Sequence, residues 1–397
     1  MRNYYLFILF CISLCSCGNH SGSGVVGSIN GDLSRMDRVA IEEGPNFSVD
    51  SCIAKIEYVK LGNTGDVLIG KVTHMLFTPD RIVVGDAYMS KAVFVFDREG
   101  NPRAVINRLG RGPQEYQNID DVFLTPDRQA IGIVDNSDEK LLYFDMDGNF
   151  LRGQSLPFSC HDIEWIDDRT MMLVANGWNS LSPALESYPG KEDLLFFTDT
   201  TLRNIYSSAF INLFDVKIFH TQPLDVKRFD ERIYAGKAFG DTIYQVTKES
   251  IFPRYWIDMK GIGGDANFGK DMSDEKLREI ISRSHFSNSY VVTDDYVFFR
   301  VTKNGIMFPV LLNEHTKKVY NIGFDSRAAL SVHLLLAEFS DANRFVVAVH
   351  AFQFLTFCPD EVPGVELRNE IKEGLSDEDN PVLLFYTLKD PDVPATE

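Results

Sequence analysis

The sequence predicts an all-β protein, a six-bladed β-propeller, on three observations. Aromatic residues make up 12% of the 397 residues, with 30 Phe and 15 Tyr, and this composition favours strands over helices. Six short turns that carry an acidic residue recur along the chain, and β-rich runs follow each turn. The aspartates of these turns are spaced 41 to 65 residues apart, near or above the spacing of propeller blades: Asp80, Asp127, Asp168, Asp230, Asp295 and Asp341.

Each turn is expected to join the innermost strand of a blade to its second strand, and a third strand follows. The expected second strands are 82–84, 131–134, 171–174, 233–235, 297–299 and 345–348. The expected third strands are 93–97, 141–145, 194–197, 242–246, 309–312 and 382–386. Their phenylalanines, such as Phe94 and Phe144, are expected to pack between blades.

Ring closure follows from counting strands. The β-rich run Cys52–Leu61 precedes the first blade, whereas the last blade lacks a fourth strand after Leu388. We therefore expect Cys52–Leu61 to be the outer strand of blade six, which removes the open sheet edges. The propeller then spans residues 50–390, with 391–397 as a C-terminal tail. Small helical insertions are expected from Ser273 and over Leu367–Leu375, where apolar residues repeat at helical spacing.

The N-terminus reads as an export signal. Residues 1–16 combine Arg2 with a short apolar run, and Leu14-Cys15-Ser16-Cys17 resembles a bacterial lipobox. The resemblance implies cleavage before Cys17 and lipidation of Cys17; Cys15 as the acceptor, or a plain secretory signal, is the alternative. Because Gly18-Asn19-His20 brings no acidic residue after Cys17, we expect attachment to the outer membrane facing the periplasm, with display on the cell surface as the alternative. Residues 17–49 are rich in Gly and Ser and are expected to form a flexible tether.

Charge and cysteine content exclude some functions. The net charge of −18 disfavours nucleic acid as a partner. Cys52, Cys160 and Cys358 have no zinc-finger spacing and are expected to be buried, unreactive thiols, with a Cys52–Cys358 disulfide as the alternative. The sequence has no G-x-S-x-G, H-E-x-x-H, P-loop or dinucleotide-binding motif.

Three separated motifs occur in order: Leu109–Tyr116 (LGRGPQEY), Phe239–Tyr244 (FGDTIY) and Asn380–Leu384 (NPVLL). With them the chain resembles the six-bladed β-propeller lipoproteins of Gram-negative bacteria, which are similar to NHL-type and TolB-like propellers. The resemblance implies the fold and export, but it assigns no catalytic residue.

Two loops carry candidate ligand-binding residues. Arg111, Glu115 and Tyr116 lie in the connection from blade one to blade two, where Arg111 could bind a carboxylate or a sugar. The alternative is that Arg111 pairs with an acidic residue of a neighbouring blade. Trp178 lies in a polar insertion of blade three and could stack on a sugar ring, or it could fix this loop to the propeller.

Histidines cluster in or near the expected innermost strands, which line the channel. They are His74, His161, His220, His285 and His333, with carboxylates such as Asp120, Asp121, Asp162 and Glu164 nearby. We take His161 and His285 as candidate ligand-binding residues. Hydrogen-bonded channel residues are the expectation, and a transition-metal site is the alternative.

These observations favour a membrane-anchored binding module for a glycan, a peptide or an envelope protein, without catalysis and without a cofactor. The rival hypothesis is a metal-dependent hydrolase or lyase that uses the channel histidines and carboxylates. The fold alone does not decide between the two.

Overall fold

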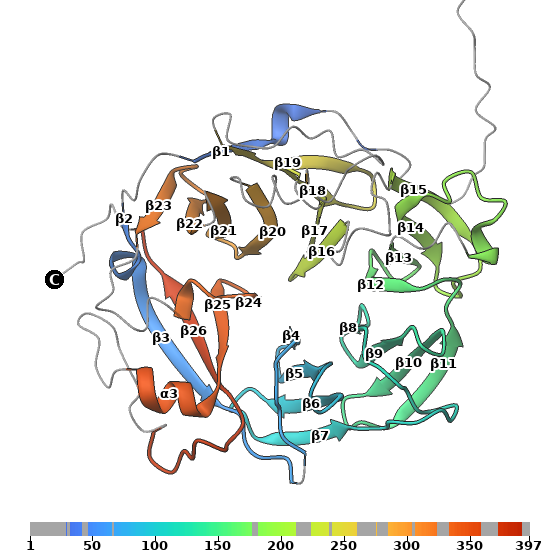
Figure 1. Ribbon diagram of the computed structural model, residues 1–397, viewed down its shortest axis with the longest axis horizontal. Coiled ribbons are helices and arrows are strands. Elements are labelled where there is room, and N and C mark those ends of the chain that lie inside the picture. The colour runs from blue at the N-terminus through green and yellow to red at the C-terminus, as the bar shows by residue number, and fades with distance from the viewer. Residues whose placement is uncertain are drawn as a thin grey trace, which may run out of the picture.

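The computed structural model describes most of the chain. The described residues are 29, 32–41, 47–65, 67–176, 182–211, 224–237, 240–259, 275, 285–303, 306–323, 333–358 and 372–390. They form six β-sheets arranged in a ring around a central channel, which confirms the predicted six-bladed propeller (Figure 1). The lipobox, the expected tail 391–397 and most of both expected helical insertions lie outside the described residues.

The first three blades each consist of four consecutive antiparallel strands. Blade one contains β4 (His74–Phe77), β5 (Arg81–Asp86), β6 (Ala92–Asp97) and β7 (Pro102–Ile106). Blade two contains β8 (Asp121–Leu124), β9 (Ala130–Asp135), β10 (Lys140–Asp145) and β11 (Phe150–Ser155). Blade three contains β12 (Cys160–Trp165), β13 (Thr170–Ala175), β14 (Asp193–Asp199) and β15 (Ile205–Ile211).

Blades four and five each carry a fifth strand from the N-terminal segment. Blade four contains β16 (Leu224–Phe229), β17 (Arg232–Lys237), β18 (Thr242–Val246) and β19 (Ile251–Asp258), and β1 (Asp37–Ala40) pairs in parallel with β19. Blade five contains β20 (His285–Val292), β21 (Tyr296–Lys303), β22 (Ile306–Asn313) and β23 (Val319–Gly323), with β2 (Phe47–Ser48) parallel to β23.

The fifth strands correct the expectation of a flexible tether over residues 17–49. Strands β1 and β2 and the short 3-10 helix η1 (Leu33–Arg35) occupy its second half. The physical reason is that the outer strand of a blade exposes unpaired backbone groups, and an extended segment can satisfy them. Val39 is fully buried in this pairing, so β1 also contributes to the core.

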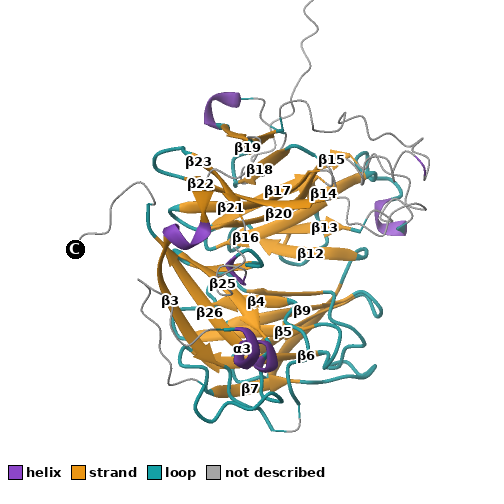
Figure 2. Cartoon of the chain, turned by 60° about the vertical axis from the view of Figure 1, so that its left-hand side comes forward, coloured by secondary structure: helices purple, strands orange, loops and turns teal. Residues whose placement is uncertain are grey.

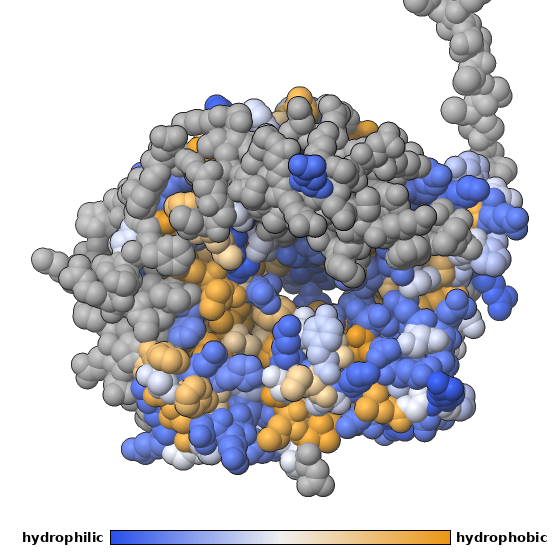
Figure 3. Space-filling model, viewed as in Figure 1, coloured by the Kyte–Doolittle hydropathy of each residue, from blue (hydrophilic) through white to orange (hydrophobic). Residues whose placement is uncertain are grey.

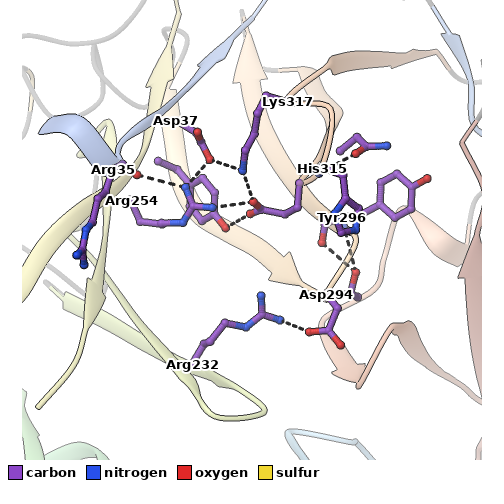
Figure 4. Close-up of polar contacts among 12 residues, drawn as sticks. Arg35, Asp37, Arg232, Arg254, Asp294, Tyr296, His315 and Lys317 are labelled. Carbon is purple, nitrogen blue, oxygen red and sulfur yellow. Dashed lines mark hydrogen bonds and ion pairs between the residues drawn. The ribbon is translucent and has the colours of Figure 1, made fainter.

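A network of ion pairs holds β1 between blades four and five (Figure 4). Asp37 accepts hydrogen bonds from Arg254 of β19 and from Lys317, whose Nζ is 2.9 Å from Asp37 Oδ2. Glu314 binds the same two cations, each at 2.7 Å. Because Lys317 and Glu314 lie in the turn between β22 and β23, the network ties the N-terminal segment to two neighbouring blades.

Blade six is completed as predicted. It contains β24 (Phe339–Asp341), β25 (Arg344–Val349) and β26 (Val382–Leu388), and β3 (Ile53–Lys60) is its outer strand. Strand β3 follows the 3-10 helix η2 (Val49–Cys52) and runs antiparallel to β26, from the Val382–Lys60 pair to the Leu388–Ile53 pair. An early segment therefore closes the ring with the last strand of the chain.

The six predicted acidic turns all join an inner strand to a second strand. In blade one the Thr78 hydroxyl accepts a hydrogen bond from the amide of Arg81 at 2.9 Å, which fixes the tight turn. The turn between β6 and β7 lies on the same face of the ring. There Asp97 accepts a hydrogen bond from the amide of Asn101 at 2.8 Å, and Gly100 adopts a φ of +86°. A Cβ on Gly100 would also lie 2.1 Å from the Lys60 carbonyl oxygen, so glycine is required where blade one meets β3.

Helices are few in the described residues. A 3-10 helix, η4 (Pro183–Leu185), lies in blade three, and α3 (Ala351–Phe357) lies in the insertion of blade six, before the range in which we expected a helix. Figure 2 shows α3 on the outside of the ring. None of the described helices is long and apolar enough to cross a membrane.

The core lies between the blades. The predicted inter-blade aromatics are fully buried: Phe94, Phe96, Phe144, Phe196 and Phe197. Cys52, Cys160 and Cys358 are buried and none of them is in a disulfide, so the alternative Cys52–Cys358 bond is not formed. Burial raises the pKa of the Cys52 thiol to about 12, which makes it a poor nucleophile.

Candidate functional site

Histidines and carboxylates from four consecutive inner strands lie in the central channel. They are His74 on β4, Asp121 on β8, His161 and Asp162 on β12, and Asp225 on β16. We call these five residues the channel cluster. Figure 3 shows an opening at the centre of the ring with hydrophilic residues along much of its rim. The inner strands therefore bring polar groups from blades one to four to one place.

Asp121 joins the first three blades. Its Oδ2 accepts a hydrogen bond from the amide of Ile163 on β12 at 2.8 Å, and its Oδ1 lies 3.6 Å from His74 Nε2. Burial, together with the nearby Asp162, raises the pKa of Asp121 well above its usual value. Burial and the neighbouring His161 lower the pKa of His74 to about 4. Both effects favour the uncharged forms in this part of the channel.

His161 and Asp162 are adjacent in sequence, yet both side chains meet at one point. A β-bulge lies here, because Cys160 pairs with Ala175 and Asp162 with Val174, which leaves His161 as an extra residue. His161 Nε2 is 3.6 Å from Asp162 Oδ2, which is too long for a hydrogen bond. The buried Asp162 Oδ2 has no hydrogen-bond partner in the described structure.

Asp225 of blade four completes this group. One donor atom each of His161, Asp162 and Asp225 lies within 4.8 Å of the others. Lys227 Nζ is 3.1 Å from Asp225 Oδ2. Burial raises the pKa of Asp162, and Asp225 and Glu164 raise it further, whereas Lys227 and the Val226 amide act in the opposite direction. The arrangement can hold protons or bind a cation.

One end of the channel opens into a pocket of about 360 Å³, which we call the mouth pocket. The turns between the first and second strands of five blades line it, together with inner-strand residues such as Trp165. The lining turns are Thr78–Pro79, Thr125–Pro126, Ile166–Asp167, Asp230–Glu231 and Ser340–Ala342.

Ion pairs between blades stiffen the mouth pocket. Arg128 of blade two reaches Asp230 and Glu231 of blade four, at 2.8 and 2.7 Å. Arg228 of blade four donates to Glu164 of blade three at 2.6 Å and to the carbonyl oxygen of Trp165. Arg98 of blade one pairs with Asp341 of blade six. Most charges of the mouth are therefore matched by partners from another blade.

The predicted loop residues do not converge on a ligand site. Arg111 is exposed and donates to Gln117 Oε1 at 3.3 Å. Gln117 in turn donates to Asp138 of blade two, and the charge of Arg111 helps to lower the pKa of that carboxyl, as expected for the acidic partner in a neighbouring blade. Glu115 Oε2 accepts from the amide of Gly112 at 2.8 Å and holds the turn. Tyr116 is fully buried, which corrects its assignment as a ligand-binding residue, because its hydroxyl lies 2.9 Å from the carbonyl oxygens of Lys91 and Ile106.

The remaining candidates are distributed differently from the prediction. His285 is the first residue of the inner strand β20, as expected. His333 does not lie in an inner strand; it precedes β24, and its Nδ1 is 3.7 Å from Cys358 Sγ. Trp178 and His220 lie outside the described residues.

Sequence reasoning missed Asp225 and the mouth arginines. A positional signal was available for part of the cluster: His74, Asp121 and Asp162 each precede the turn aspartate of their blade by six residues. Equal spacing from the turn implies equal depth in the channel. Asp225 precedes its turn aspartate by five residues and is therefore offset by one from this position. Because Lys227 follows two residues later, the segment has the alternating charges of an ordinary exposed strand.

The fold and its channel define a six-bladed β-propeller with a polar central site that is rich in titratable groups. A family model matches residues 35–387, and the chain belongs to that family, which is described as a domain of unknown function, DUF4934. No curated protein sequence matches the chain.

Two solved structures share the fold. One is a "Putative exported protein" from Bacteroides fragilis, with 19% identity, a TM-score of 0.70, and coverage of 89% of this chain and 100% of that one. The other is a member of the DUF4221 family from Bacteroides vulgatus, with 10% identity, a TM-score of 0.51, and coverage of 85% and 98%. At these identities the likeness concerns the fold.

Proposed function

We propose that this protein is a binding module of the bacterial cell envelope that takes a glycan or a peptide in its mouth pocket. The observation that carries the proposal is that turns from five blades converge on one pocket of about 360 Å³, within the size range of small-ligand sites. Peptides and glycans both need hydrogen-bond donors and acceptors at fixed positions, with an apolar surface beside them.

The side chains of the mouth pocket fit such a ligand. Arg98, Arg128 and Arg228 present planar donor groups, and their acidic partners hold them in place before a ligand arrives. Such preorganisation lowers the entropic cost of binding. Trp165 and Phe77 add apolar surface beside these charges.

Binding should be tested with defined probes. We would apply the purified chain to an array of bacterial oligosaccharides and to a library of short peptides, and then measure affinities by calorimetry. We expect Arg128→Ala to weaken binding of the selected probe at least about 10-fold. Arg103→Ala is the matched control, because Arg103 also pairs with an aspartate, Asp97, but lies on the outer strand β7. The proposal fails if no probe binds, or if both variants bind as the unmodified chain does.

The envelope location rests on the N-terminus and is tested separately. The lipobox ending at Cys17 supports outer-membrane attachment, and the related fold described as an exported protein is consistent with export. Cys17→Ala should abolish labelling by radioactive palmitate and release the protein from the membrane fraction. A labelled, membrane-bound Cys17→Ala variant would contradict lipidation at this residue. Protease treatment of intact cells should leave the protein uncut if it faces the periplasm.

A further inference from the structure

The wall of the channel between blades three and four holds three potential metal ligands that the proposed binding of glycan or peptide does not use. His161 and Asp162 come from β12, and Asp225 comes from β16. None of the three lines the mouth pocket. The β-bulge at His161 turns two consecutive side chains toward the same point, and bulges commonly re-aim side chains in this way at functional sites.

The distances fit one small cation. In a tetrahedral zinc site with bonds of about 2.1 Å, neighbouring donor atoms are separated by about 3.4 Å. His161 Nε2 and Asp162 Oδ2 are 3.6 Å apart, and donor atoms of all three residues lie within 4.8 Å of one another. Small rotations of the side chains would therefore bring all three donors to bonding distance of a shared ion.

One carboxylate oxygen of the site, Asp162 Oδ2, receives no hydrogen bond within the described part of the chain, and a bound cation would fill this role. Asp162 Oδ2 is buried and has no hydrogen-bond partner among the described residues, although a buried carboxylate oxygen ordinarily requires one. Four carboxylates approach one another here, from Asp121, Asp162, Glu164 and Asp225. Arg228 is bound to Glu164 and Lys227 to Asp225. Lys227 also acts electrostatically on Asp162, but neither Asp121 nor Asp162 forms an ion pair with a lysine or arginine of the described chain.

We propose that His161, Asp162 and Asp225 bind a divalent transition-metal ion in the channel wall. One imidazole nitrogen with two carboxylates suits Zn²⁺ and similar ions, whereas Ca²⁺ and Mg²⁺ prefer sites made only of oxygen ligands. Three protein ligands leave at least one coordination position of the metal open toward the channel. Lys227 competes with the metal, because its ammonium already lies against Asp225.

Zn²⁺ itself is the probe for this site. The purified chain, freed of any histidine tag and stripped with a chelator, should bind one equivalent of Zn²⁺ in a competition titration with a chromogenic chelator. His161→Ala and Asp225→Asn should each weaken binding at least about 100-fold, since each removes a metal ligand. Co²⁺ bound in the same place should give visible absorption bands typical of a four-coordinate site.

Two variants separate a metal site from a merely structural cluster. His315→Ala is the matched control, because His315 also lies beside an aspartate, with Nε2 2.7 Å from Asp295 Oδ1, but far from β12 in the sequence and outside the cluster. It should leave zinc binding unchanged. Lys227→Gln should strengthen binding several-fold, because it removes the competing cation, whereas loss of a structural ion pair would not.

The proposal is overturned if no stoichiometric Zn²⁺ binds at micromolar concentration. It is also overturned if the His161→Ala and Asp225→Asn variants, shown to be folded by circular dichroism, bind as tightly as the unmodified chain. Anomalous diffraction at the zinc edge should place the ion between β12 and β16, and a peak elsewhere would contradict the assignment. Glycan or peptide binding in the mouth pocket is measured separately, so either proposal can fail alone.

Discussion

The mouth pocket and the channel cluster lie along the same inner strands, but of the two only the mouth pocket has its carboxylates paired with arginines. At the mouth, arginines meet carboxylates of other blades, as in the Arg128–Asp230 and Arg228–Glu164 pairs. In the channel, Asp121 and Asp162 face neutral imidazoles and each other. The contrast teaches that the mouth is organised for rigidity between blades, whereas the channel has an excess of acidic groups.

The largest expected effect comes from the channel. Asp121→Ala leaves the buried amide of Ile163 without its acceptor, and we expect it to lower the free energy of unfolding by about 2–3 kcal/mol. Asp121→Asn keeps an acceptor and removes a charge that the site disfavours, so it should have little effect at pH 7. Urea denaturation of both variants tests the comparison, and equal destabilisation would show that the charge itself matters.

The second-largest effect is expected from low pH, which should lower the unfolding free energy through His74 in the channel. Burial lowers the pKa of His74 in the folded protein to about 4, from 6.5 when exposed, so the unfolded chain takes up the proton first as pH falls. The stabilising contribution of the neutral His74 is therefore lost between about pH 6.5 and 4, and this loss amounts to about 2 kcal/mol at pH 5. In His74→Gln, the fall in unfolding free energy from pH 7.5 to 5.0 should be smaller. An identical fall would mean that His74 is not buried as a neutral group.

The half-buried pair at the mouth should have a moderate effect. Arg228→Ala removes the hydrogen bonds to Glu164 and to the carbonyl oxygen of Trp165, and we expect a loss of about 1–2 kcal/mol. Arg228→Lys should recover part of this loss, because it keeps the charge without the planar donor group. Chemical denaturation at neutral pH measures the unfolding free energy of both variants. An unchanged value for Arg228→Ala would show that this ion pair does not help to hold blades three and four together.

The smallest effect is expected for the exposed pair at the rim. Asp230 and Glu231 are 54% and 78% exposed, so Arg128→Ala should cost only about 0.5 kcal/mol of stability. This difference should disappear in 1 M salt, where screening is strong. A larger loss that persists in high salt would show that Arg128 supports the fold rather than the surface that we propose for ligand binding.

Local chemistry made the fold predictable. Turns such as Thr78–Arg81 and Thr125–Arg128 resemble each other because a threonine hydroxyl accepts from a backbone amide and caps the same tight bend in blades one and two. Closure by Cys52–Leu61 followed from counting strands. The parallel strands β1 and β2 could not be foreseen, since their partners are more than 200 residues away and only the outer edge of a finished blade provides the pairing.

The site was only partly predictable. Inner-strand positions of His74 and His161 followed from their distance to the turns, and the structure brings both into the channel cluster. The bulge that aims His161 beside Asp162 depends on pairing between β12 and β13, which sequence spacing does not reveal. Tyr116 was misassigned because a tyrosine in a glycine-rich loop reads as exposed, whereas its ring fills the space between blades one and two.

The pairing of β3 with β26 also governs how copies of this protein can meet. Roughly 320 residues separate the two strands, so blade six stays open until nearly the entire chain has been synthesised. During that interval β3 can add to blade six of a second molecule with the same register that it would use in its own. The geometry thus provides a route to domain-swapped dimers, in which each ring is sealed by the other's N-terminal strand.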